Sequence, residues 1–119
     1  MTSRTTADPR TPADRTPAEE YDRARLHFDS KAYSDAARIL QPLVAAEPGQ
    51  LAARMLLARS YYHSAQLERA AAELREVLAQ DPAESYAHLM LGRTLERQGR
   101  GEEARPHLRL AAAMNDAFA

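Results

Sequence analysis

Residues 51–84 have the sequence LAARMLLARSYYHSAQLERAAAELREVLAQDPAE, in which apolar residues recur with the period of an α-helix. Leu57, Ala58 and Tyr61 fall on one face of a first helix, because they are spaced by one to four residues. The polar stretch around Ser64-Ala65-Gln66 predicts a turn. A second helix then has an apolar face of its own, made by Leu67, Ala70, Leu74, Val77 and Leu78. The segment therefore predicts a helix-turn-helix unit.

The same pattern recurs every 34 residues along most of the chain. Three columns of residues keep this interval: Ala24, Ala58 and Gly92; Ala36, Ala70 and Ala104; Leu40, Leu74 and Leu108. Pro48 and Pro82 keep it as well. The small residues of the first two columns allow a pair of helices to approach closely. A repeat of this length is typical of a solenoid, in which each unit buries its apolar face against its neighbours.

Some positions depart from the repeat. The first unit is polar at three positions that the other units fill mostly with apolar residues: Glu20, Arg23 and His27. Pro42 and Pro106 fall inside the predicted second helices, and each predicts a bend because proline removes a backbone hydrogen bond.

The segment Asp81-Pro82-Ala83-Glu84 predicts a helix start, with an acidic cap, an early proline and a capping-box glutamate.

These features resemble the tetratricopeptide repeat, which forms one helix pair in each repeat of about 34 residues. The middle unit carries most of the resemblance, through Leu57, Ala58, Tyr61, Ala70, Leu74 and Pro82. The resemblance implies an all-α fold, a right-handed α-solenoid of three helix-turn-helix tetratricopeptide repeats at about 17–50, 51–84 and 85–118. We expect the repeat domain over 18–119 and a disordered leader of Thr, Pro and Arg over 1–17. The leader has no apolar residue larger than alanine after Met1, so it cannot offset the entropy of ordering.

The amino-acid composition argues against several classes of function. The net charge of −1 leaves no basic excess, which argues against a nucleic-acid binder and against attachment to anionic lipid. Cysteine is absent, and no apolar run is long enough for a secretory signal or a membrane span, so we expect a cytoplasmic protein. Lys31 is the only lysine beside fifteen arginines, which is typical of a GC-rich genome. The resemblance itself is to short bacterial proteins of three tetratricopeptide repeats.

The resemblance implies that a partner peptide or short helix binds in a concave groove lined by the first helix of each repeat. The predicted groove residues are Tyr21, Arg25, Met55, Arg59, Tyr62, Tyr86, Leu89 and Arg93. The three arginines form a ladder with one member per repeat, and arginine grips carboxylates bidentately, so the ligand is expected to be acidic or to end in a carboxylate. Two alternatives remain open. The arginines could pair with acidic residues of the next repeat, and Phe28 and Tyr62 could belong to the core between repeats.

A carboxylate clamp of the chaperone type is not expected, because that clamp needs Lys and Asn at particular groove positions. Those positions hold Tyr21, Arg25, Leu56, Tyr86 and Met90. An enzyme is not expected either, because no serine lies in a nucleophile-elbow or phosphate-loop context. The histidines His27, His63, His88 and His107 are interpreted as dispersed surface or boundary residues, and no metal or cofactor is expected.

The second functional hypothesis is self-association. Leu110, Met114 and Phe118 are spaced by four residues and form one apolar strip on the last helix. The ends of solenoids that no capping helix covers tend to pair with another surface. A homodimer through residues 105–119 would cover the strip, and folding back of Met114 and Phe118 as a short cap is the equal alternative.

Overall fold

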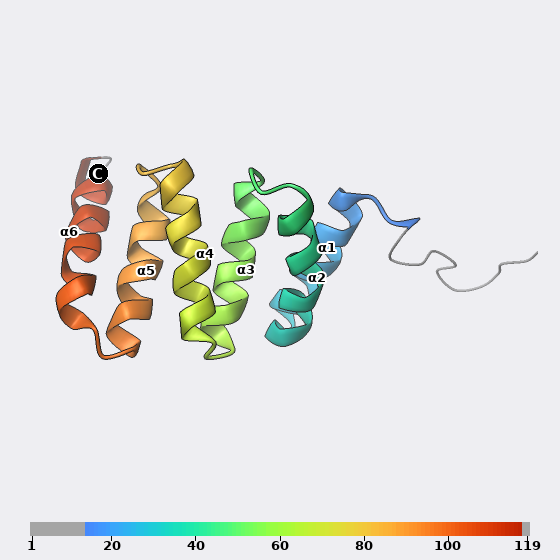
Figure 1. Cartoon of the computed structure of the whole chain (residues 1–119), viewed down its shortest axis with the longest axis horizontal. Helices are drawn as coiled ribbons and strands as arrows, with labels where there is room; N and C mark the ends of the chain where they lie inside the picture. Colours follow the sequence, from blue (N-terminus) through green and yellow to red (C-terminus); the bar gives the residue numbers. More distant parts are fainter. Residues whose placement is uncertain (1–13, 118–119) are drawn as a thin grey trace, which may run out of the picture.

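The computed structural model of the chain describes residues 14–117. Over these residues the chain forms helices and no strand, and the helices stand side by side in chain order (Figure 1). Their bounds are α1 (Pro17–Asp29), α2 (Tyr33–Ala46), α3 (Leu51–His63), α4 (Leu67–Gln80), α5 (Ser85–Arg97) and α6 (Gly101–Ala117). The prediction of an all-α solenoid built from helix pairs is confirmed.

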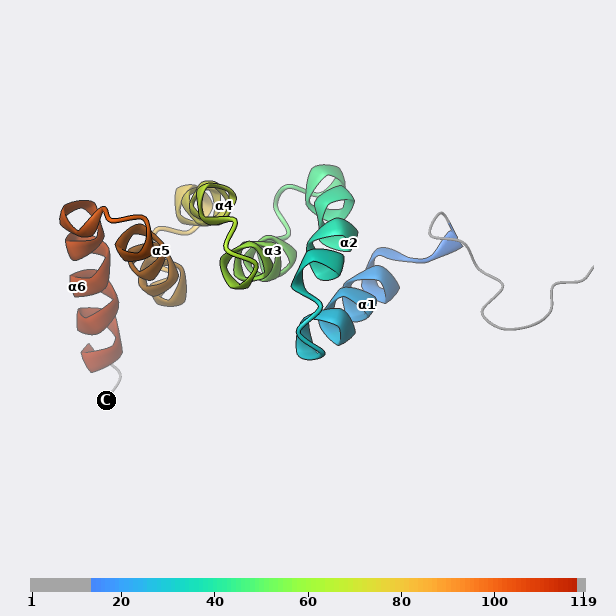
Figure 2. The same ribbon diagram turned by 90° about the horizontal axis from the view of Figure 1, so that it is seen from below.

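The helices form two layers, with α1, α3 and α5 on one side and α2 and α4 on the other (Figure 2). Within the first layer α1 contacts α3, and α3 contacts α5. Within the described residues, α2 and α4 make fewer contacts with each other than these inner pairs do, and the same holds for α4 and α6. A curved array brings its helices closer together on the inner side. The first helix of each repeat therefore lines the concave face.

The core follows the predicted columns. Ala24, Ala58, Leu40 and Leu74 are fully buried, and so is the column Ala36, Ala70 and Ala104. Gly92 leaves room for Leu108 of α6 against α5, because a Cβ atom placed there would lie 2.5 Å from Cδ2 of Leu108. Close packing at the small-residue columns is thus what joins the two helices of each repeat.

The turn inside each repeat uses the left-handed backbone region at one register position. Lys31, Ala65 and Gly99, which occupy the same position in successive repeats, have φ angles of 65°, 62° and 76°. In each turn the next residue donates its N–H to a carbonyl five residues back, as Gln66 does to Tyr61 at 2.8 Å. This is the Schellman arrangement, which ends a helix by satisfying its last carbonyls. The turn predicted around Ser64-Ala65-Gln66 is confirmed.

Helix starts differ from the prediction in two places. The fifth helix begins at Ser85 with Glu84 as its N-cap, whereas Asp81 is the C-cap of α4, so the predicted start at 81–84 is wrong. The Asp81 carboxylate accepts the N–H of Ala83 in the connecting loop and does not cap a helix. At the other end of the chain Thr16 caps α1 and forms a capping box with Glu19. The predicted leader thus overlaps this cap, and its residues 1–13 lie outside the described part of the chain.

The prolines predicted to bend second helices lie inside α2 and α6, which continue through Pro42 and Pro106. None of the described helices has both the length and the apolar character needed to cross a membrane.

Candidate functional site

The predicted groove residues lie on α1, α3 and α5, the helices of the concave face. Arg25, Tyr86 and Arg93 are exposed to solvent. The half-buried members are Tyr21, Met55, Arg59, Tyr62 and Leu89. The inner helices therefore present guanidinium groups beside partly covered aromatic and aliphatic side chains.

Arg59 is the most engaged member of the ladder. Its guanidinium carbon lies 4.6 Å from the centre of the Phe28 ring and 5.8 Å from the centre of the Tyr86 ring. These rings belong to the repeats before and after it, and both lie within the range of cation–π attraction to the guanidinium group. Its Nε atom is buried and has no hydrogen-bond partner among residues 14–117. Arg59 is therefore a positioned cation with an unused donor.

Arg97 is a fourth arginine of this surface, one helical turn beyond Arg93. Its guanidinium carbon lies 4.6 Å from the centre of the Tyr62 ring, and Nη1 donates to the backbone oxygen of Tyr62 at 3.0 Å. This residue was not among the predicted groove residues, because the other repeats carry Asp29 and His63 at the same position. Its spacing from Arg93 on one helix was the available signal.

The pKa of His63 is affected by the positive charge of this surface. Its ring stacks on Tyr33 with the ring centres 4.8 Å apart, and Phe28 packs edge-on at 5.7 Å. Burial lowers the pKa of His63, and the positive charges of Arg59 and Arg97 lower it further. The imidazole thus resists protonation in a locally positive environment.

Within residues 14–117 no carboxylate forms an ion pair with Arg25, Arg59, Arg93 or Arg97. The inner helix α3 does carry a paired arginine elsewhere, because Nη1 of Arg54 donates to Glu73 of α4 at 2.7 Å. Two acidic residues share repeat positions with the groove residues: Asp29 is in register with Arg97, and Glu96 is in register with Tyr62. The surface consequently holds more cations than anions.

Comparison with known sequences assigns the fold to a family. Two sequence profiles described as tetratricopeptide repeat match residues 27–88 and 64–117. The chain belongs to the tetratricopeptide repeat family. Tetratricopeptide repeat domains are protein–protein interaction modules and are generally non-catalytic.

Solved structures of MamA share this tetratricopeptide repeat fold. MamA of MSR-1 has a TM-score of 0.81 at 20% identity, over 87% of this chain and 60% of that one. For MamA of AMB-1 the TM-score is 0.83 at 21% identity, over 88% and 62%. For MamA of Desulfovibrio magneticus RS-1 it is 0.77 at 26% identity, over 82% and 55%. The chain thus spans less than two thirds of each of these proteins. No match was found among functionally curated proteins.

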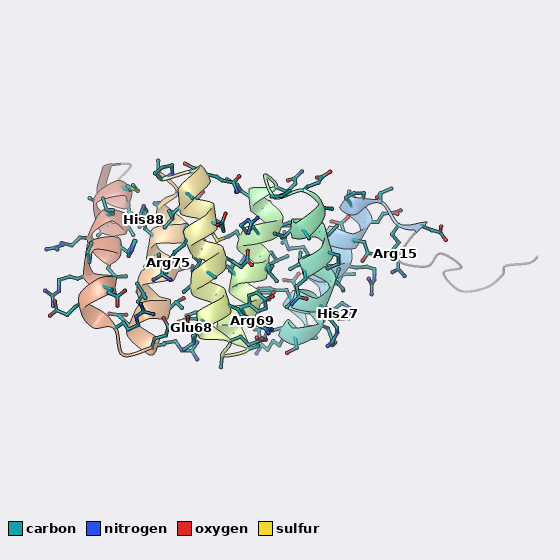
Figure 3. The ribbon with its side chains drawn as sticks, viewed as in Figure 1. Arg15, His27, Glu68, Arg69, Arg75 and His88 are labelled. Atoms are coloured by element: carbon teal, nitrogen blue, oxygen red, sulfur yellow. The ribbon has the colours of Figure 1, made fainter. Side chains whose placement is uncertain are left out.

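The interpretation of all four histidines as dispersed is wrong for His88 and His107. His88 is buried, and its Nδ1 lies 3.0 Å from Nδ1 of His107 with the rings stacked. Nε2 of His88 faces the Pro82 carbonyl at 2.9 Å and must donate to it, so Nδ1 of His88 accepts from His107. Figure 3 labels His88 on α5 and, on the neighbouring α4, Arg75.

This histidine pair occupies the same register as the ion pair of the middle tetratricopeptide repeat. His88 and His107 lie one full repeat after Arg54 and Glu73. The proline carbonyls also correspond, because Arg54 donates to Pro48 and His88 to Pro82. Antiparallel packing therefore brings one polar position of the first helix against one of the second. In the described part of the chain no group of three His, Asp or Glu side chains could hold a metal ion.

The strip predicted for self-association lies on α6. Leu110 is 45% exposed and Met114 is half-buried, whereas Phe118 lies outside the described residues.

Proposed function

We propose that this tetratricopeptide repeat domain binds an acidic peptide segment of another protein across its concave face. The observation that carries the proposal is the set of four inner-helix arginines without a carboxylate partner in the described chain, Arg25, Arg59, Arg93 and Arg97. Unpaired cations close together repel one another, and a carboxylate ligand would relieve that repulsion.

Arg59 supplies the central contact of the proposed site. Its stacking between Phe28 and Tyr86 fixes the guanidinium plane before the ligand arrives, so little side-chain entropy is lost on binding. The donors lie along the edge of the guanidinium group, so a carboxylate that approaches its two Nη atoms leaves the ring contacts in place. The exposed Arg25 and Arg93 flank it one repeat away on either side.

The test uses a fluorescein-labelled peptide of alternating glutamate and alanine, with binding followed by fluorescence anisotropy. Wild type is compared with Arg25→Glu/Arg59→Glu/Arg93→Glu and with a control, Arg75→Glu/Arg105→Glu/Arg109→Glu. The control residues are exposed on α4 and α6, and both variants change the net charge equally. We expect the groove variant to bind at least about a hundredfold more weakly, because each reversal replaces an attraction with a repulsion.

The control should bind nearly as tightly as wild type, and circular dichroism should show both variants folded. Equal binding by the groove variant and wild type would overturn the proposal. If the groove variant does bind more weakly, affinity capture from a native lysate with the same three proteins identifies the natural partner. That partner is a protein that wild type and the control retain and that the groove variant loses.

Self-association through α6 is a second candidate, favoured by the 45% exposure of Leu110. Wild type should then be a dimer in light scattering, and Leu110→Asp/Met114→Asp should be a folded monomer that still binds the acidic peptide. A wild-type protein that is monomeric at high concentration would remove this candidate.

A further inference from the structure

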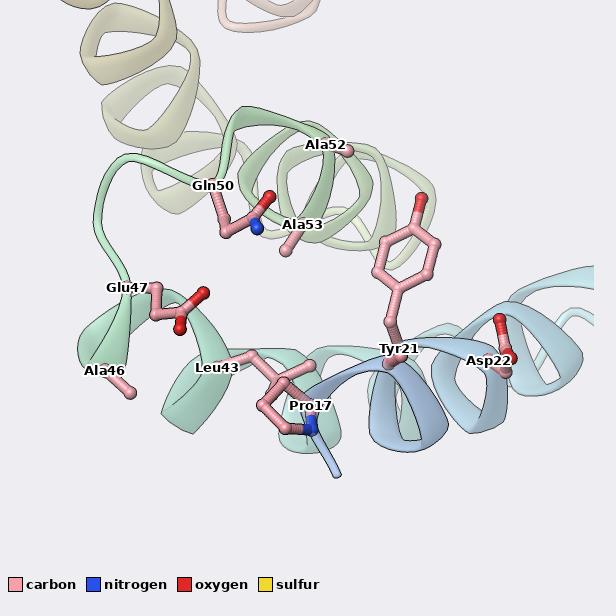
Figure 4. Close-up of a pocket in the computed structure, with 10 residues that line it drawn as sticks. Pro17, Tyr21, Asp22, Leu43, Ala46, Glu47, Gln50, Ala52 and Ala53 are labelled. Atoms are coloured by element: carbon pink, nitrogen blue, oxygen red, sulfur yellow. The ribbon is translucent and has the colours of Figure 1, made fainter. Parts of the chain in front are cut away.

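Two cavities open at equivalent places along the inner helices. The first has a volume of about 430 Å³ between α1, the end of α2 and the start of α3 (Figure 4). The second has a volume of about 360 Å³ at the next junction, between α3, α4 and the start of α5. Each residue that lines the second lies one full repeat after a residue that lines the first: Leu51, Ala52, Met55, Val77, Glu84 and Tyr86. The cavities are thus one feature repeated with the fold.

Each cavity has mainly apolar walls. In the first, Tyr21 projects from α1 toward the helix that carries Ala52, and Leu43 lines the cavity from α2 (Figure 4). In the second, Met55 and Val77 take the places of Tyr21 and Leu43. Ala52 lines both cavities. Cavities of this size and character bind apolar side chains.

The spacing of the cavities restricts the shape of a ligand that fills both. Neighbouring inner helices contact one another, so equivalent points on them lie about one helix width apart, on the order of 10 Å. A polyproline II segment returns to the same face every three residues, after about 9.3 Å. A β-strand returns after about 6.6 Å or about 13 Å, so its side chains would miss one of the two cavities.

Charge restricts the ligand further. Asp22 and Glu47 line the first cavity and Glu84 lines the second, whereas the arginines lie about one turn farther along the inner helices. A polyproline II segment has three faces, which suits this division. One face enters the cavities, the next reaches the arginines, and the third meets the acidic rim or solvent.

We propose that the two cavities bind two apolar side chains three residues apart on an extended, polyproline II-like segment of the partner protein. An acidic residue stands beside each apolar one and pairs with Arg59 and Arg93, and the third position carries no acid. This inference rests on the proposed function, because the acidic residues of the same segment meet the groove arginines.

The probes are fluorescein-labelled synthetic peptides of identical composition that contain two leucines, two glutamates and several prolines and glutamines. The leucines are spaced by two, three, four or seven residues, and the three-residue series has glutamate on either side of leucine because the chain direction is open. Binding is followed by fluorescence anisotropy. We expect the best three-residue peptide to bind at least about tenfold tighter than any other spacing, because only it buries both leucines.

The decisive variant is Ala52→Leu, since Ala52 lines both cavities and is exposed on α3. Its control is Ala72→Leu, an exposed alanine of α4 that lines neither. We expect Ala52→Leu to remove the advantage of the three-residue peptide and Ala72→Leu to preserve it. Circular dichroism checks that both variants are folded.

The other outcomes separate this inference from the proposed function. Equal binding of all spacings, lost in Arg59→Gln, would overturn the paired cavities and leave the acidic groove standing. A seven-residue optimum would overturn the extended ligand in favour of a helical one. A three-residue advantage that survives Ala52→Leu would place the leucines elsewhere and overturn the inference. Absence of binding by every peptide, or binding that ignores Arg59→Gln, would overturn both proposals.

Discussion

Nδ1 of His88 lies 3.0 Å from Nδ1 of His107, so these two imidazoles share a single proton between α5 and α6. Protonating both would place two donors, each carrying positive charge, at hydrogen-bond distance from one another. The hydrogen bond that joins the two helices of the last repeat at this point therefore requires that one of the two Nδ1 atoms stays unprotonated.

The first prediction is that acid destabilises the last repeat. Burial lowers the pKa of His107 below 6.5, and the charges of His88 and Arg75 lower it further. The unfolded chain then binds a proton more readily than the folded one, so stability is complete above pH 6.5 and falls as the pH drops toward the folded pKa. Thermal unfolding at pH 7.5 and pH 5 should show a lower melting temperature at pH 5.

The variant His88→Arg/His107→Glu gives this position the pair found at Arg54 and Glu73 in the middle repeat. It should lose part of the drop in melting temperature. The remainder should persist because burial and nearby arginines also lower the pKa of His63. A drop in the double variant as large as in wild type would contradict the role of the histidine pair.

The second prediction concerns Gly92. An alanine there would place its Cβ 2.5 Å from Cδ2 and 2.6 Å from Cγ of Leu108, so the Leu108 side chain must shift or α5 and α6 must move apart. Overpacking costs about 1–3 kcal/mol, and alanine recovers about 1 kcal/mol of helix propensity. Gly92→Ala should therefore lower the free energy of unfolding by about 1 kcal/mol in urea titration. In a Leu108→Ala background the same change should become stabilising, and Gly101→Ala, which meets nothing within 4 Å, should not be destabilising.

The third prediction concerns the left-handed turn residues. Ala65 and Lys31 adopt positive φ, which costs a residue with a Cβ atom about 1 kcal/mol relative to glycine. Ala65→Gly should thus raise the urea midpoint of unfolding, whereas Gly99→Ala should lower it by a similar amount. Unchanged midpoints in both variants would show that the turns tolerate either residue equally.

The fourth prediction separates the arginines of the groove. Arg59→Lys keeps the charge but loses the flat surface that stacks on Phe28 and Tyr86, so it should weaken acidic-peptide binding by about tenfold. Arg93→Lys, at an exposed and unstacked position, should weaken binding far less. Equal losses in anisotropy titrations would mean that stacking contributes nothing to the site.

The helix pairs and the middle turn were predictable from the sequence because they depend on local spacing. The small residues Ala36, Ala70 and Ala104 recur at a fixed interval, and each is buried where the two helices of a repeat pack together. The start of α5 was not predictable from capping patterns alone, because Asp81 is a preferred N-cap residue and Glu84, which caps the helix, is not.

Contacts between helices were harder to predict, because they join residues far apart in the chain. Arg59 meets one ring from the repeat before its own and another from the repeat after it. The register of the repeats could have suggested the pairing of His88 with His107, since Arg54 and Glu73 are complementary charges at the same two positions. Two histidines have no such complementarity, so the signal was visible only in the middle repeat.

The position of Arg59 between Phe28 and Tyr86 bears on how the array unfolds. Solenoids lose their repeats one after another when only adjacent units stabilise each other, and strong coupling makes the loss all-or-none. Arg59 gains both ring contacts only while the first, second and third repeats are all folded. A ligand that grips the edge of this guanidinium would therefore stabilise three repeats at once, and binding should sharpen the unfolding transition as well as raise its midpoint.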